Sequence, residues 1–146
     1  MDRREALGLL GAGTASLAAI GAGGALAAEN PEHRDNPHEA CLKACKACAT
    51  ECAEMWHHCV EQLAAGKKEY AKALQLITDC EAFCTLSASM IARMSPLMAY
   101  SCGACADACR DCAKECDQLG SAPLKECAER CRACEKTCRD MVSAMG

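Results

Sequence analysis

Aromatic side chains are almost absent from this chain. Its 146 residues include one Trp, one Phe and two Tyr, and Val, Ile and Leu are also sparse beyond the N-terminal segment. The length suffices for one domain. With so few large apolar side chains, that domain cannot build an ordinary core, so another kind of interaction must hold its elements together.

Positive charge is not in excess in this chain. The 16 Lys and Arg residues are outnumbered by 20 Asp and Glu, which gives a formal net charge of −4. This balance leaves no basic patch and argues against nucleic acid as a partner. No Ser–His–Asp or Cys–His arrangement indicates catalytic turnover, so we expect a protein that is not an enzyme.

The first residues have the pattern of a targeting segment. Arg3 and Arg4 precede a weakly apolar stretch of Ala, Gly and Leu that ends in Ala25-Leu26-Ala27, an A-x-A cleavage signal. The twin arginine and the many glycines resemble a Tat leader. We therefore predict a cleaved signal peptide over 1–27, a linker over 28–36 and export to the periplasm, with the membrane met only during export. A membrane anchor or an N-terminal helix is the alternative, but the glycines disfavour a helix.

The rest of the chain contains start and stop signals for four helices. Asn36-Pro37 begins the first, Gly66 ends it, Ser95-Pro96 separates the second from the third, and Gly120-Ser121 separates the third from the fourth. Serines 95 and 121 are expected to cap the helices that follow them. No strand pattern interrupts the expected helices over 37–65, 68–94, 96–119 and 122–145. The prediction is an all-α protein, an antiparallel up-down-up-down four-helix bundle over 37–146.

Cysteine is the abundant residue, and its spacing alternates between three and four. This is the rhythm of a helix that presents one face to partner helices, at positions that leucine normally holds. The bundle is therefore predicted to have a cysteine-lined core. The sixteen cysteines form four runs: Cys41, Cys45, Cys48, Cys52 and Cys59; Cys80 and Cys84; Cys102, Cys105, Cys109, Cys112 and Cys116; and Cys127, Cys131, Cys134 and Cys138.

Three roles for these thiols can be compared. Small buried hydrophobes would explain one or two of them, but not sixteen in register. Disulfides within a helix are disfavoured, because Cβ atoms at i,i+4 lie roughly 5–6 Å apart and a disulfide needs about 3.8 Å. Disulfides between different helices are not excluded by this geometry. Two metal–sulfur bonds of about 2.3 Å span roughly 4.6 Å, close to the helical separation, so the spacing favours metal binding.

The identity of the metal follows from how the thiols are arranged. Zinc needs four converging ligands, commonly from compact knuckles, and iron–sulfur clusters need loop-borne cysteines at spacings that this chain lacks. Cu(I) accepts two or three soft sulfurs, so a continuous ladder suits it best. Zinc or mixed d¹⁰ metals remain the alternative.

The two ends of the expected bundle differ in composition. Antiparallel packing brings one histidine and five methionines to one end, namely His38, Met90, Met94, Met98, Met141 and Met145. Thioether sulfur binds Cu(I) weakly, and flexible methionines also serve simply to fill a bundle end. The opposite end carries an apolar plug of Leu63, Tyr70, Leu119 and Leu124. No role is assigned to His57, His58 or Trp56.

The cysteine ladders, the four helices and the twin-arginine leader resemble the exported bacterial copper storage proteins. The resemblance covers the chain after the leader. It implies multiple Cu(I) ions along the bundle axis, held by all sixteen cysteines, and uptake at an open end through His38, Met94, Met98 and Met145. It leaves homo-oligomer formation and the copper donor and acceptor open. The rival functions are a zinc or broad d¹⁰-metal detoxification buffer and a disulfide-stapled helical adaptor.

Overall fold

Four helices make up the part of the chain that the computed structural model describes, residues 36–146. They are α1 (Pro37–Ala64), α2 (Tyr70–Ala92), α3 (Met98–Leu119) and α4 (Ala122–Met145). The predicted leader and all but the last residue of the predicted linker lie outside the described residues. None of the four helices is both long and apolar enough to cross a membrane.

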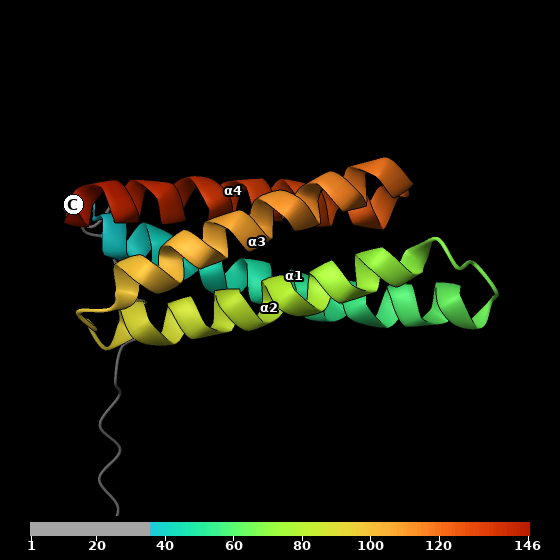
Figure 1. Cartoon of the computed structure of the whole chain (residues 1–146), viewed down its shortest axis with the longest axis horizontal. Coiled ribbons are helices and arrows are strands. Elements are labelled where there is room, and N and C mark those ends of the chain that lie inside the picture. Colours follow the sequence, from blue (N-terminus) through green and yellow to red (C-terminus); the bar gives the residue numbers. More distant parts are fainter. Residues whose placement is uncertain (1–35) are drawn as a thin grey trace, which may run out of the picture.

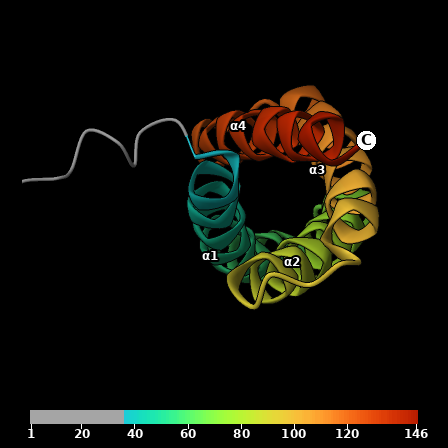
Figure 2. The ribbon, with the colours of Figure 1, turned by 90° about the vertical axis from the view of Figure 1, so that its left-hand side faces the viewer.

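The helices form the predicted up-down-up-down bundle. Each helix runs antiparallel to the one before it, so the start of α1, the α2–α3 connection and the C-terminus share one end (Figure 1). Viewed from that end, α1, α2, α3 and α4 follow one another around a central axis, and α4 returns beside α1 (Figure 2). The inner faces of all four helices therefore meet along one axis.

One of the three predicted side-chain caps is present. The Asn36 Oδ1 atom accepts a hydrogen bond of 3.0 Å from the His38 amide at the start of α1. The expectation for Ser95 is wrong, because Leu97 is the N-cap of α3 and makes no side-chain cap. The Ser95 hydroxyl instead accepts a hydrogen bond of 3.3 Å from the Leu97 amide in the turn before the helix. The expectation for Ser121 is wrong, because its hydroxyl is buried without a hydrogen-bond partner within residues 36–146. Pro123 removes one of the two amides that a cap at this position would serve.

The α2–α3 connection is longer than the sequence predicts. Helix α2 ends at Ala92 rather than 94, and α3 begins at Met98 rather than 96. Met94 adopts a left-handed conformation with φ of 53°, and the Ser95 amide donates back to the Met90 carbonyl at 3.0 Å. This is the hydrogen-bond pattern of a helix C-terminus that usually carries glycine. Met94 is therefore a turn residue rather than the last residue of α2.

The core lies where the cysteine rhythm predicts it. All sixteen cysteine side chains are 0% exposed. Conventional packing is concentrated in a few larger residues, of which Ile77, Ile91, Leu124 and Met141 are almost fully buried. Helix α2 supplies two of these four, in line with its having only two cysteines. Ion pairs tie the helices together outside the core, including Arg139 with Asp107 at 2.7 Å between α4 and α3.

Candidate metal centre

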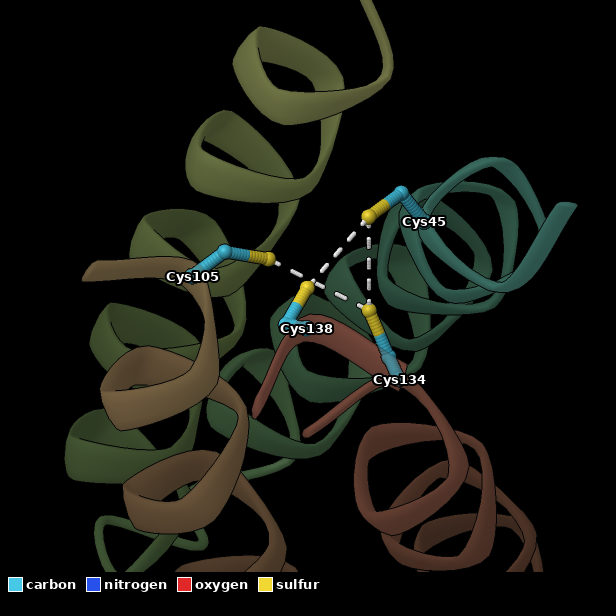
Figure 3. A group of neighbouring side chains, drawn as sticks. All are labelled: Cys45, Cys105, Cys134 and Cys138. Atoms are coloured by element: carbon cyan, nitrogen blue, oxygen red, sulfur yellow. Dashed lines mark hydrogen bonds between the residues drawn. The ribbon is translucent and has the colours of Figure 1, made fainter. Parts of the chain in front are cut away.

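Thiols from different helices converge on the bundle axis. Figure 3 shows one group, in which Cys45 comes from α1, Cys105 from α3, and Cys134 and Cys138 from α4. The sulfur of Cys45 lies 3.6 Å from that of Cys138 and 3.7 Å from that of Cys134. All four sulfurs lie within 4.8 Å of one another. A soft metal ion could reach several of them with small side-chain adjustments.

Such groups succeed one another along the axis and share members. Cys84 of α2 joins the next group, with its sulfur 3.5 Å from that of Cys105 and 3.7 Å from that of Cys109. Since each group shares sulfurs with another, the thiols form a continuous ladder rather than separate sites. The further four-sulfur groups are Cys84, Cys105, Cys109 and Cys134; Cys48, Cys80, Cys84 and Cys109; Cys48, Cys52, Cys80 and Cys131; and Cys52, Cys112, Cys127 and Cys131.

None of the sixteen thiols is in a disulfide. The closest of the measured sulfur–sulfur contacts is 3.5 Å, between Cys84 and Cys105, whereas a disulfide bond is about 2.05 Å long. Two metal–sulfur bonds of about 2.3 Å at a trigonal angle separate their sulfurs by about 4 Å. The contacts of 3.5–4.0 Å along the ladder exclude covalent bridges and leave sulfur separations that a shared metal can span with small adjustments.

Hydrogen bonds between thiols set their acidity. The pKa of Cys48 is held below its usual value because Cys109 and other neighbouring thiols stabilise its thiolate. The pKa of Cys109 is raised because it shares its proton with Cys105 and other thiols, and because it is buried. The two pKa values move in opposite directions because neighbouring thiols share hydrogen bonds. A metal ion that binds several sulfurs must displace the shared protons.

Cys59 stands apart from the ladder. It is fully buried, but no other thiol lies close enough to hydrogen-bond to it within the described part of the chain. Burial, with smaller effects of Cys127 and Cys112, raises the pKa of its thiol to about 11. Every other cysteine lies in contact with at least one further thiol, including Cys102 beside Cys41 at 4.0 Å and Cys116 beside Cys112.

The end of the bundle where the sequence places His38 and five methionines is called the methionine end. The structure separates these residues into buried and exposed side chains. Met98 is 4% exposed and Met141 is 0% exposed, so both line the core next to the last thiols. Met94 is 61% exposed and Met145 is 40% exposed, so their predicted inward placement is wrong. Met94 lies in the left-handed turn after α2, and Met145 is the last residue of α4. His38 is half-buried in the first turn of α1.

Met141 was missing from the predicted site, although its spacing could have included it. It follows Cys138 by three residues and so continues the inward face of α4. Met98 and Met141 are buried in the core, and the half-buried Met90 and Met55 pack against it.

The opposite end is closed as predicted. Tyr70 and Leu124 are buried there, and Leu63 and Leu119 are half-buried and pack against the core. The His58 ring lies edge-on to Tyr70, with ring centroids 5.9 Å apart. The plug itself is apolar, and the buried Nε2 atom of His58 beside it has no hydrogen-bond partner within residues 36–146.

Trp56, which the sequence left unassigned, borders a groove of about 360 Å³ between α1 and α2. Cys52 lies at this groove, but its side chain is 0% exposed. His57 lies on the surface, with its Nε2 atom 3.4 Å from a carboxylate oxygen of Glu61. Neither Trp56 nor His57 adds a ligand to the ladder.

A four-helix bundle filled with reduced thiols defines a class of multi-metal binding proteins. The sequence profile of the copper storage protein family matches residues 33–143. The chain belongs to this family.

Individual relatives agree with this assignment. The "uncharacterized cysteine-rich protein YhjQ" of Bacillus subtilis is 31% identical over 78 residues, which cover 53% of this chain and 70% of that protein. The structure is also similar to that of the Cu(I)-bound copper storage protein BsCsp3. The TM-score is 0.69 and the identity 29%, with 73% of this chain and 99% of the other covered.

A second solved relative is a cytosolic copper storage protein from Streptomyces lividans, described with five coppers. Its TM-score is 0.69 and its identity 25%, and the match covers 75% of this chain and 95% of that one.

Proposed function

We propose that this protein stores or sequesters multiple Cu(I) ions as thiolate complexes in the core of its helical bundle. The observation that carries this proposal is the continuous ladder of sulfur groups along the axis, in which neighbouring groups share members. Shared sulfurs allow bridging thiolates, and these raise the number of ions held per cysteine. The sixteen cysteines are the proposed ligands, with Cys59 the least engaged.

Copper fits this core better than zinc does. Zinc prefers a separate tetrahedral site with four sulfurs of its own, whereas successive groups here compete for the same thiols. Cu(I) is satisfied by two or three soft sulfurs and tolerates bridging. Membership of the copper storage protein family supports the same choice.

Copper uptake is proposed to occur at the methionine end. Buried Met98 and Met141 offer weak thioether ligands just outside the first thiols, and half-buried His38 lies at the same end. Transfer from thioether to thiolate sulfur is downhill, so these residues can pass Cu(I) inward. The exposed Met94 and Met145 are proposed only as outer capture sites.

The location of this protein is proposed from its first residues alone. The twin arginine and the A-x-A signal support export through the Tat pathway to the periplasm. The S. lividans relative is described as cytosolic. Fractionation of cells that express the full chain, with N-terminal sequencing of the product, tests this. A periplasmic protein that starts close to residue 28 is the expected result, and an uncleaved cytosolic protein would contradict it.

Anaerobic titration of the reduced protein with Cu(I), against a chromogenic chelator, tests the storage function. If thiolates bridge fully, capacity approaches one ion per cysteine, and without bridging it falls to about half of that. We therefore expect roughly 8–16 ions per chain. A parallel Zn²⁺ titration should saturate at no more than about four ions, one for each set of four thiols. A Cu(I) plateau at one or two ions would refute storage.

A further inference from the structure

One position on the inner face of α2 carries a hydroxyl in place of a thiol. The inward residues of this helix follow the spacing of three and four through Cys80, Cys84, Ser87 and Ile91. Ser87 is 0% exposed. It therefore faces the core at the place where the rhythm of the other helices has cysteine.

The Ser87 hydroxyl makes no hydrogen bond within the described residues. A buried hydroxyl without a partner costs about 1–3 kcal/mol, and in a helix it can usually donate to a carbonyl of its own helix. Two other hydroxyls near this end do so. The Ser101 hydroxyl donates to the Met98 carbonyl at 2.9 Å, and the Thr137 hydroxyl to the Cys134 carbonyl at 3.1 Å.

The register of the helices tells which thiols lie at the level of Ser87. The sulfur of Cys84 contacts those of Cys105 at 3.5 Å and Cys134 at 3.8 Å. Ser87 lies about one turn beyond Cys84 toward the methionine end. In the same direction, Cys102 lies about one turn beyond Cys105 in α3, and Cys138 about one turn beyond Cys134 in α4. Cys102 and Cys138 are therefore at the level of Ser87.

The thiols of this outermost layer are themselves in contact. The sulfur of Cys41 lies 4.0 Å from that of Cys102 and 3.6 Å from that of Cys138. The layer thus contains thiols from three helices and the Ser87 hydroxyl from the fourth.

We infer that Ser87 is a positioning residue for copper, and that its hydroxyl donates a hydrogen bond to a copper-bound thiolate of Cys102 or Cys138 in this outermost layer. The inference rests on the proposed function. Within the described residues no thiol lies in hydrogen-bonding geometry with this hydroxyl, so it stays unpartnered in the metal-free bundle. When Cu(I) displaces the protons of the neighbouring thiols, the thiolates become strong acceptors, and a small side-chain rotation brings the hydroxyl to one of them. The Ser87 hydroxyl then gains a partner only in the loaded state.

This arrangement predicts effects of opposite sign in the two states. The variant Ser87→Ala removes an unsatisfied group from the metal-free protein, so its urea midpoint should stay the same or rise. It also removes a hydrogen bond to a charged sulfur from the loaded protein. Such a bond is worth roughly tenfold in affinity or more, so part of the copper should pass to the chelator at about tenfold lower chelator concentration. A side chain that only packs the core would weaken the metal-free protein and leave the competition curve unchanged.

Ser101→Ala is the matched control, because this serine is also buried at the same end but its hydroxyl is already bonded within α3. It should leave the competition curve unchanged. A second test compares Ser87→Ala in the wild-type and Cys138→Ala backgrounds. The two effects should be less than additive if Ser87 acts through this layer, and additivity would contradict the inference.

Ser87→Cys provides an independent measurement if Ser87→Ala alters folding. Its added thiol should be protected from a thiol reagent in the copper-loaded protein, as the neighbouring thiols are. One reactive thiol per chain after loading would place residue 87 outside the copper layer and overturn the inference. The wild-type titration separates this outcome from failure of storage itself. A wild-type plateau at one or two ions refutes storage, whereas a high wild-type capacity with an unchanged Ser87→Ala curve refutes only the role of Ser87.

Discussion

The two cysteines of α2 should contribute to copper capacity far more than the buried Cys59 of α1. The sulfur of Cys80 lies 3.6 Å from that of Cys109 and 3.8 Å from that of Cys131, and Cys84 has a similar set of close neighbours. Cys59 has no thiol close enough to hydrogen-bond to it in the described part of the chain. We therefore compare the double variant Cys80→Ala/Cys84→Ala with Cys59→Ala.

The expected loss follows from the stoichiometry of the ladder. Each cysteine accounts for about half an ion to one ion, depending on how far thiolates bridge, so the double variant should lose about one to two Cu(I) per chain. Cys59→Ala should lose no measurable capacity. Both changes remove small, fully buried side chains, so the metal-free fold should lose only about 1 kcal/mol per site.

Anaerobic Cu(I) titration measures both capacities, and circular dichroism of the metal-free variants checks that each remains helical. The reasoning would be refuted if Cys59→Ala lowered capacity by half as much as the double variant, or by more. That result would mean that the bundle rearranges on loading to draw Cys59 into the ladder.

Four other variants and a change of pH test further parts of the structure. Leu124→Ala in the apolar plug should reduce the free energy of unfolding of the metal-free protein by about 2–5 kcal/mol, measured by urea denaturation, and leave copper capacity unchanged. Replacing Met98 and Met141 together with leucine should slow Cu(I) uptake in stopped-flow loading, whereas Met94→Leu should have a smaller effect because that side chain is exposed; equal rates would contradict uptake through the buried pair. Met94→Gly should stabilise the protein by about 1 kcal/mol, because this position is left-handed, and a loss of stability would contradict the turn geometry. Cu(I) affinity from chelator competition should rise between about pH 6 and about pH 8, because ladder thiols such as Cys109, whose pKa is raised by its hydrogen bond to Cys105 and by burial, must lose protons to bind metal; an affinity independent of pH would contradict proton displacement.

The methionine end illustrates what periodicity could not resolve. Met94 and Met145 continue the spacing of three and four, so the sequence predicts that they face inward. Their positions depend on where the helices stop. Met94 follows the end of α2 in a left-handed turn, and Met145 is the last helical residue of α4. Periodicity predicts the direction of a side chain only while the helix continues and its neighbours cover that face.

Ser87 and Cys59 show a related limit. Their spacing predicts that both are buried, and both are. Whether a buried group has a partner depends on the axial register of four helices, which no single helix determines. Within residues 36–146 the register leaves the Ser87 hydroxyl without a hydrogen bond and Cys59 without a thiol in hydrogen-bonding distance.

The sequence by itself determined the fold class, the inner face of each helix and the soft-ligand character of the core. These properties follow from local signals, namely helix caps and breakers and a repeat of three and four, which act within one helix. The tertiary structure alone decided which sulfurs meet, which methionines reach the axis and which hydroxyl stays unpartnered. Those outcomes depend on contacts between residues far apart in the chain, such as Cys41 with Cys138, because antiparallel packing sets the level of each side chain along the common axis.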